Sequence, residues 1–162
     1  PCLVNKDSYI GNVNGVMNAV ITEGEPVGES VLQGEGAGPG PTSSALMSDL
    51  LSILRGNIKF PFGIPNIKRK SIKVFNYDNY INSLYLRFEV KDKPGVLAQI
   101  TNRLALKNIS VERLIQIPNY KNKTASIVII THKSKELDAQ HCINAISKSK
   151  NILKYPTLIR LL

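Results

Sequence analysis

The sequence predicts an α+β protein in two parts: a segment of strands and one helix at residues 1–56, and a βαββαβ unit at residues 84–162. Three patterns predict the βαββαβ unit. Apolar residues first alternate with polar ones, which places them on one face of a strand; they then recur at helical spacing; further strand-like and helical runs follow. The alternating residues are Leu84, Leu86, Phe88 and Val90, and the helical ones are Leu97, Ile100 and Leu104.

A turn with the sequence D-K-P-G at residues 92–95 separates this strand from the helix. Pro94 suits the first turn of a helix, where its missing N–H would have no partner anyway. Asp92 is placed to cap the N-terminus of the helix and to complement its dipole. At the other end of the helix, Asn108 is one of the few residues besides glycine that tolerate the left-handed conformation.

The remaining residues complete the unit with three strands, a polar hairpin loop at residues 118–123 and a second helix. The β-branched run at residues 127–130 is expected in a central strand. His141 lies on the second helix, where we expect a partly buried side chain rather than a metal ligand. The predicted strands are Ile109–Ile117, Ala125–Thr131 and Leu158–Leu162, and the apolar residues of the helix are Leu137, Cys142, Ala145 and Ile146.

The residues around the turn have a combined pattern that is more specific than any turn. They are Asp92, Pro94, Gly95, Val96 and Leu97, followed by Asn108, Ile109, Ser110 and Val111. This pattern resembles the signature of the ACT domain, a small module that binds amino acids in regulated biosynthetic enzymes. The resemblance implies a ferredoxin-like βαββαβ fold. A ferredoxin-like domain without a ligand is the alternative.

Residues 1–33 read as short strands that contain many small residues, which indicates that another backbone or a ligand comes close. A turn at residues 22–24 precedes a second strand, Pro26–Leu32, which is an edge candidate because Pro26 cannot donate to a ladder. Two strands cannot bury a core alone. We therefore expect this segment to need a larger sheet and, without it, to be poorly ordered or to associate with a second copy.

A glycine-rich loop, G-E-G-A-G-P-G at residues 34–40, leads into an apolar helix. Its open N–H groups before a helix N-terminus suit a polar or anionic group, and the alternative is a tight connection whose small residues serve packing. The loop is neither a P-loop nor a G-x-G-x-x-G dinucleotide fingerprint. The helix carries Leu46, Leu50, Ile53 and Leu54, and Gly56 is a natural end.

Three features of this first part occur together: N-V-x-G-x-x-N-A-V at residues 12–20, G-x-G-A-G-x-x-P-T-x-S-A at residues 34–45, and an apolar helix with Asp49 and Leu50. They resemble the end of the catalytic part of homoserine dehydrogenase. In that family this segment completes a substrate-binding and dimer-forming sheet, and bacterial members often carry an ACT domain after a linker. The resemblance implies a partial catalytic-domain sheet and helix at 1–56, a linker at 57–83 and an ACT domain at 84–162.

The resemblance implies cofactor-binding residues in this chain but no catalytic ones. In the family, the glycines of G-x-G-A-G lie against the nicotinamide end of NAD(P), which carries over to Gly36, Ala37 and Gly38. Thr42 and Ser43 would then cap the following helix. The family's Rossmann domain, catalytic lysine and acidic homoserine-binding residues have no counterpart here. We therefore expect the chain alone to bind no NAD(P) and to be inactive as a dehydrogenase.

An amino-acid effector would bring an ammonium and a carboxylate group. Asp92 offers a carboxylate for the first, and the helix start at Gly95, Val96 and Leu97 offers N–H groups for the second. The resemblance places the pocket at an interface between two such domains, with facing residues near Ser110, and implies threonine, the end product of the pathway, as the effector. The alternative is a degenerate ACT domain that serves only oligomerisation.

The net charge of +9 resides in the second part of the chain, because residues 84–162 hold fourteen basic and five acidic groups. A basic half can indicate nucleic-acid binding, but these lysines are not interleaved with aromatic residues, so we predict a solvated surface and no nucleic-acid partner. No apolar run approaches the roughly 20 residues that span a bilayer, and we predict no membrane partner. Two cysteines and two histidines predict no metal site and a cytoplasmic protein with reduced thiols.

The sequence therefore predicts the C-terminal part of an NAD(P)-dependent homoserine dehydrogenase, which interconverts homoserine and aspartate semialdehyde, with a regulatory ACT domain. We expect it to form homo-oligomers through its ACT and dimerisation segments. Because the chain begins with Pro1, we expect a processed product, a deliberately trimmed form or a fragment of a longer protein. The alternatives are a stand-alone amino-acid-binding or oligomerisation module and an inactive relic of a decayed gene.

Overall fold

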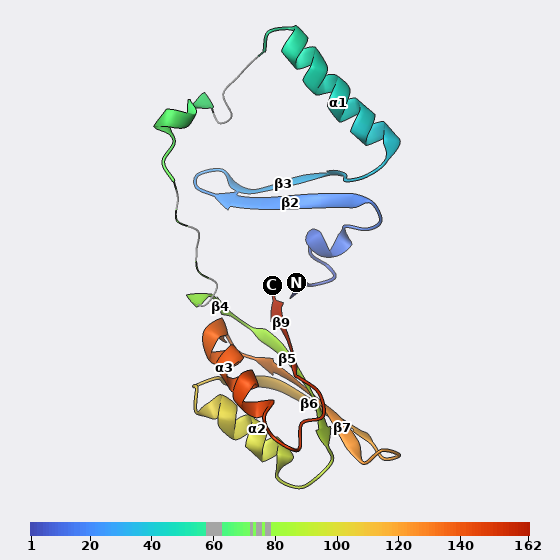
Figure 1. Cartoon of the computed structure of the whole chain (residues 1–162), viewed down its shortest axis with the longest axis vertical. Coiled ribbons are helices and arrows are strands. Elements are labelled where there is room, and N and C mark those ends of the chain that lie inside the picture. The colour runs from blue at the N-terminus through green and yellow to red at the C-terminus, as the bar shows by residue number, and fades with distance from the viewer. Residues whose placement is uncertain (58–62, 72, 74–75, 77–78) are drawn as a thin grey trace. The chain divides into compact units, whose positions relative to one another are not determined.

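The computed structural model describes residues 1–57, 63–71, 73, 76 and 79–162. The chain divides into two compact units (Figure 1). One comprises Pro1–Asn5 and Val74–Leu162, and the other comprises Lys6–Lys73. Positions 58–62, 72, 74–75 and 77–78, all within the predicted linker 57–83, lie outside the described residues.

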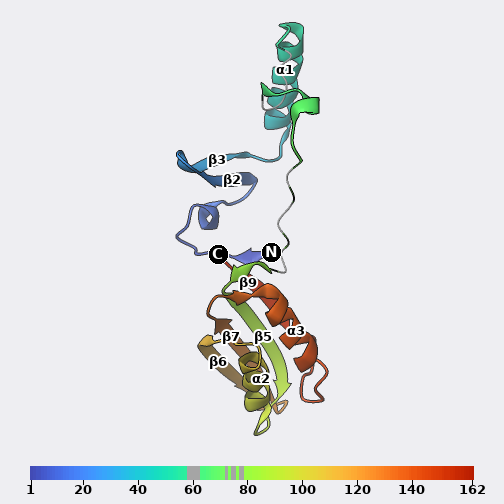
Figure 2. The ribbon, with the colours of Figure 1, turned by 90° about the vertical axis from the view of Figure 1, so that its left-hand side faces the viewer.

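The first unit is a mixed sheet with two helices on one face (Figure 2). Its strand order, β1-β9-β5-β7-β6, contains the ferredoxin-like arrangement of a βαββαβ unit, and every pairing is antiparallel except that of β1 with β9. The predicted α+β fold class is therefore confirmed. The strands are β1 (Cys2–Leu3), β5 (Leu84–Lys91), β6 (Val111–Asn119), β7 (Thr124–Thr131) and β9 (Thr157–Leu161), the helices are α2 (Val96–Ala105) and α3 (Glu136–Ile146), and β4 (Ile81–Asn82) pairs with β8 (Ser134–Lys135).

The core of this unit lies between the helices and the two central strands. The alternation in β5 and β7 places every second side chain against the helices. Where β5 begins, the buried Thr131 hydroxyl accepts a hydrogen bond from the Leu84 amide at 3.1 Å, so no buried N–H is left unpaired at that point. The fully buried residues are Leu84, Leu86, Phe88, Ile100, Leu104, Ile127, Ile129, Ala139, Ile143 and Ile146, together with Val90 and Ala125.

The start of α2 differs from the sequence prediction. The helix begins at Val96 rather than Pro94, and its N-cap is Gly95, in the left-handed conformation with φ 86°. No side chain caps this end, so the predicted Asp92 cap is wrong: two residues of turn separate Asp92 from the N-cap. At the other end, the predicted left-handed conformation of Asn108 is confirmed at φ 54°.

Two further details of the unit also differ. The second strand spans Val111–Asn119 rather than 109–117, because the chain is still completing the turn after α2 at Ile109, whose amide donates to the Leu104 carbonyl at 3.0 Å. His141 is exposed, so the predicted partial burial is wrong: α3 turns Ala139, Cys142, Ile143 and Ile146 towards the core.

The second unit is a β-hairpin followed by a helix. The hairpin consists of β2 (Met17–Gly24) and β3 (Gly28–Glu35), and the helix is α1 (Pro39–Leu54). Because Gly38 is the N-cap of α1, the predicted capping by Thr42 and Ser43 is wrong: both residues lie inside the helix. Short 3₁₀ turns occur at Ile10–Asn12 and Asn66–Lys68, and the predicted helix end at Gly56 is confirmed by its φ of 71°.

Apolar side chains of this second unit remain uncovered. No residue of α1 is buried, and Leu54 keeps 73% and Leu32 of β3 keeps 72% of its surface exposed. Neither strand of the hairpin contains a buried residue. Among the described residues of this unit, the two strands and the helix thus bury no shared apolar core.

We predict that Ile129→Ala will destabilise the first unit by about 2–5 kcal/mol, because it removes buried methyl groups from a site with no exposed surface. Ile117→Ala is the matched control: Ile117 lies on β6 with 58% of its surface exposed, so its truncation should change stability by no more than about 0.5 kcal/mol. Urea denaturation measures both values. Equal effects of the two substitutions would contradict the core described here.

Candidate functional site

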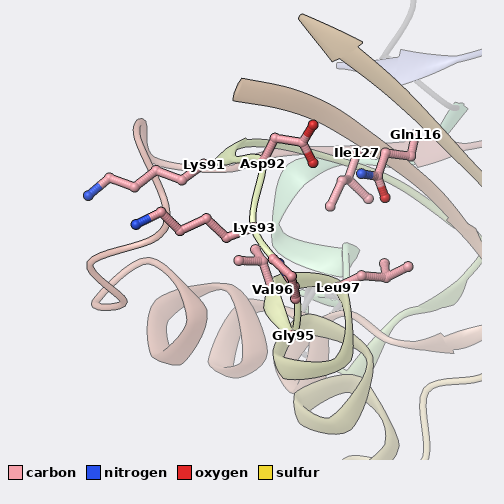
Figure 3. Close-up of a pocket in the computed structure, with 9 residues that line it drawn as sticks. Lys91, Asp92, Lys93, Gly95, Val96, Leu97, Gln116 and Ile127 are labelled. Carbon is pink, nitrogen blue, oxygen red and sulfur yellow. The ribbon is translucent and has the colours of Figure 1, made fainter. Parts of the chain in front are cut away.

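A pocket of about 390 Å³ opens beside the turn that joins β5 to α2 (Figure 3). The turn supplies most of its wall, and β6 and β7 supply one residue each. This volume lies in the range of small-molecule sites. The lining residues are Lys91, Asp92, Lys93, Pro94, Gly95, Val96 and Leu97 from the turn and its flanks, with Gln116 from β6 and Ile127 from β7.

Backbone hydrogen bonds fix the shape of this turn. The Asp92 amide donates to the Lys123 carbonyl at 3.0 Å, which ties the turn to the β6–β7 hairpin. Gly95 then adopts φ 86°, a region that side chains disfavour, and its carbonyl accepts the first strong bond of the helix from the Gln99 amide at 2.9 Å. The Val96 amide donates to the Lys93 carbonyl at 3.4 Å, whereas the next two amides of α2, those of Leu97 and Ala98, have no partner within the helix and can bind an anionic group.

The polar side chains of the pocket come from opposite sides. Figure 3 shows the Asp92 carboxylate and the Gln116 amide directed towards the same space, with Ile127 between them. Lys91 and Lys93 extend away from it. The pocket therefore combines a carboxylate, a side-chain amide, free backbone N–H groups and an apolar floor, which are the groups that a zwitterionic amino acid requires.

The structure brings four of the five predicted effector-binding residues together at this pocket: Asp92, Gly95, Val96 and Leu97. Ser110 is not among its lining residues. It lies before β6, where its carbonyl accepts a hydrogen bond from the His132 amide at 2.9 Å. The assignment of all five to effector binding stays a prediction.

Gln116 and Ile127 were not found from the sequence. Ile127 reads as an ordinary core residue of a strand. Gln116 pairs with Ile127 across β6 and β7, so it lies on the helix-facing side of the sheet. In the sequence, Gln116 stands out only as a polar residue that shares one face of β6 with Leu114 and Pro118. Recognising that this face is turned towards the helices requires the register between β6 and β7 to be known.

The predicted cofactor residues lie in the second unit, in the loop between β3 and α1. The Gly36 amide donates to the Val16 carbonyl at 2.8 Å, which holds the loop against the start of β2. A Cβ on Gly36 would overlap the side-chain amide of Asn18. Asn18 and Gly36, which come from two separate sequence motifs, are therefore packing partners.

Gly38 has a different requirement. Its φ of 126° excludes ordinary side chains, and it serves as N-cap of α1. Ala37 lies between these two glycines, and all three residues are exposed. The loop thus presents an exposed backbone before a helix N-terminus. The assignment of Gly36, Ala37 and Gly38 to cofactor binding stays a prediction.

Other reactive groups are few. Burial raises the pKa of the Cys142 thiol, which lies 3.2 Å from the Arg103 carbonyl oxygen, whereas Cys2 is exposed. Among the described residues, no cluster of His, Cys, Asp and Glu has the composition of a metal site. None of the helices in the described ranges has both the length and the apolar character needed to cross a membrane.

Two family models match separate parts of the chain. Residues 1–51 match the homoserine dehydrogenase family model. Residues 84–150 match the ACT domain model.

Curated relatives match over the entire chain. A homoserine dehydrogenase of Neisseria gonorrhoeae is 36% identical over 99% of this chain and 38% of its own length. One of Synechocystis is 32% identical over 100% of this chain and 39% of its own. The crystal structure of a homoserine dehydrogenase from Thiobacillus denitrificans aligns with a TM-score of 0.83 at 29% identity, over 100% of this chain and 38% of that one. The chain thus spans somewhat over a third of the length of these relatives.

We predict that Gly36→Ala will loosen the β3–α1 loop, because the added methyl group overlaps Asn18. Gly34→Ala is the matched control, since a Cβ there meets nothing within 4 Å and the backbone φ is ordinary. Hydrogen exchange of the amide at position 36 should become faster in the first variant and not in the second. The double variant Asn18→Ala/Gly36→Ala should recover much of the protection; no recovery would contradict the packing role of Gly36.

Proposed function

We propose, from the matches to homoserine dehydrogenases and to the ACT domain, that this chain is the regulatory end of an NAD(P)-dependent enzyme that interconverts homoserine and aspartate semialdehyde. The residues that would perform this reaction lie outside the chain. Its own contribution is the binding of an amino acid that controls the enzyme. We place the intact protein in the cytoplasm, in keeping with its free cysteines.

The observation that carries the regulatory part is the pocket beside the β5–α2 turn. Asp92 would bind the ammonium group of the effector, and the free amides of the first turn of α2 would bind its carboxylate. Gln116 and Ile127 would contact the effector's side chain, one with an amide and the other with methyl groups. A side chain with one hydroxyl and one methyl group, as in threonine, matches both.

Regulation would follow from differential affinity. An effector shifts an enzyme between two states only as far as it binds one of them more tightly. The pocket is open, and its missing wall would come from a second copy of the chain, with Ser110 near the junction. We therefore propose a homo-oligomer in which the effector binds between two ACT domains.

The cofactor NAD(P) would supply the hydride acceptor in the intact enzyme. In this chain, Gly36, Ala37 and Gly38 would lie against its nicotinamide end, where an open backbone allows close approach. The acidic residues and the lysine that orient homoserine would come from the preceding part of the enzyme. The chain would thus complete a binding surface without performing a chemical step of its own.

A stand-alone amino-acid-binding module is the second candidate, since the first unit has its own buried core and supplies all the residues that line the pocket in this chain. It predicts the same effector binding but no gain of dehydrogenase activity when the chain is joined to the missing part of the enzyme. The two candidates are therefore separated by enzyme activity and not by binding.

We predict that Asp92→Asn will raise the dissociation constant for threonine by roughly tenfold, because the substitution removes the charge that pairs with the ammonium group. Glu112→Gln is the matched control: it removes a carboxylate of the same unit that does not line the pocket. Calorimetric titration measures both, after a thermal-shift panel of amino acids on the wild-type chain. A saturating ligand at about a hundredfold its dissociation constant should stabilise the chain by roughly 2.7 kcal/mol. Equal loss in both variants would contradict the proposed role of Asp92.

We predict that the chain alone will not reduce NADP⁺ or NAD⁺ with homoserine, because it contains one glycine loop and not the enclosing cofactor site. Fusion to residues equivalent to the preceding part of a homologous enzyme should restore activity and make it sensitive to threonine. Absorbance at the nicotinamide band measures both reactions. Turnover by the isolated chain would contradict this division of roles, and an active but threonine-insensitive fusion would contradict the regulatory role.

A further inference from the structure

One end of the first unit gathers lysines from three segments of the chain. The β5–α2 turn, the β6–β7 hairpin loop and the loop after α3 lie together at this end (Figures 1 and 2). The Asp92 amide donates to the Lys123 carbonyl at 3.0 Å, and the Lys91 amide donates to the Asn151 carbonyl at 2.9 Å, so the three segments hold one another. We call this surface the basic end. Its lysines are Lys91, Lys93, Lys121, Lys123, Lys148 and Lys150.

The carboxylates of the first unit do not balance this charge. Asp92 is the only acidic residue in the three segments. Among the described residues, none of the six lysines takes part in an ion pair. Glu112, Glu136 and Asp138 lie at the opposite end of the unit, each beside a cationic side chain. The basic end therefore carries like charges whose mutual repulsion an anionic partner would relieve.

The second unit carries the opposite charge at the tip of its β2–β3 hairpin, which we call the acidic tip. Glu23 and Glu29 lie directly opposite each other where the two strands end, and Glu25 lies in the turn between them. All three are exposed, and none of them has an ion-pair partner in the described part of the chain. Like charges directly opposite each other destabilise a strand pair. A cationic surface against the acidic tip would remove this repulsion.

Each of the two surfaces also contains an exposed apolar or aromatic side chain among its charges. Val27 lies in the turn of the acidic tip and keeps 78% of its surface exposed. Tyr120 lies in the β6–β7 loop of the basic end and keeps 84% of its surface exposed. Contact between two such side chains would add apolar burial to the charge pairs around it.

A protein carboxylate fits the basic end better than a nucleic acid does. Lysine pairs with an anion as a point charge, and the basic end contains no arginine that could grip a phosphate with two donors. Stacking on bases requires aromatic side chains interleaved with the cations, and Tyr120 is the only aromatic residue in the three segments. Since the chain itself carries the complementary carboxylates, a second copy of the chain is the partner that matches this surface.

We propose that the acidic tip of one copy of the chain docks on the basic end of a second copy. The two copies contribute different surfaces, so the contact is heterologous. It is a separate contact from the effector site shared between two ACT domains that is proposed above. It also requires no bound amino acid, so its test is independent of the effector function.

Two charge-reversal variants of the full chain test the proposal by sedimentation velocity at low salt. The tip variant, Glu23→Lys/Glu29→Lys, keeps a like-charged pair across the hairpin and so leaves the balance of the strand pair unchanged. The end variant, Lys121→Glu/Lys123→Glu, alters two exposed side chains that do not line the pocket. Each variant should weaken self-association by about tenfold or more, because reversed charges at the contact repel.

The matched control is Lys133→Glu/Lys135→Glu. It makes the same change in net charge as the end variant, also on exposed side chains, but at the opposite end of the unit. It should associate within about twofold of the wild-type chain, because surface charges farther apart than a Debye length are largely screened. A loss in this control equal to that of the end variant would reduce the effect to net charge and overturn the proposal.

Mixing the two charge-reversal variants separates a lost contact from a folding defect. The end variant retains an intact acidic tip and the tip variant retains an intact basic end, so the mixture should associate although each variant alone does not. Raising the salt concentration should dissociate both the mixture and the wild-type chain. Unchanged self-association of both variants, or a mixture that fails to associate, would overturn the docking while the effector function stands. Association that disappears after nuclease treatment would assign the lysines to nucleic acid and also overturn it.

Discussion

The packing of two helices onto one face of β5 and β7 is the interaction on which the rest of the ACT unit depends. Strict alternation in both strands commits one face to α2 and α3, and the two helices together bury that face completely. Each strand lies between two others, so its backbone is paired on both edges. This layer fixes where β5 ends and α2 begins, and hence where the pocket opens.

The candidate pocket lies at the boundary of that layer. At the turn after β5, the buried alternation stops, Gly95 takes a left-handed conformation, and the first amides of α2 are left without helical partners. Beside this turn, Gln116 occupies a position on the helix-facing side of β6, where the neighbouring strand β7 carries the apolar Ile127. The pocket therefore lies where the buried core gives way to polar groups, and the packing of the core holds these groups in position.

The second unit differs from the first because its strands and its helix leave their apolar residues exposed. Its hairpin and helix carry apolar residues that nothing in the unit covers. Its local structure depends on the packing of Asn18 against Gly36 and on the backbone conformation of Gly38. This chain spans 38% and 39% of the length of two homoserine dehydrogenases that it resembles.

The sequence by itself determined the order of strands and helices from residue 84 onward, the two family resemblances and four residues of the pocket turn, because periodicity and turn chemistry are local properties. Only the tertiary structure decided that Gly95 rather than Asp92 begins α2, that His141 faces outward and that Gln116 reaches the pocket. It also decided that β1 joins the five-stranded sheet of the first unit. Each of these depends on which strands pair and in what register, and contacts between residues more than a hundred positions apart, such as Leu3 and Leu161, leave no trace in local spacing.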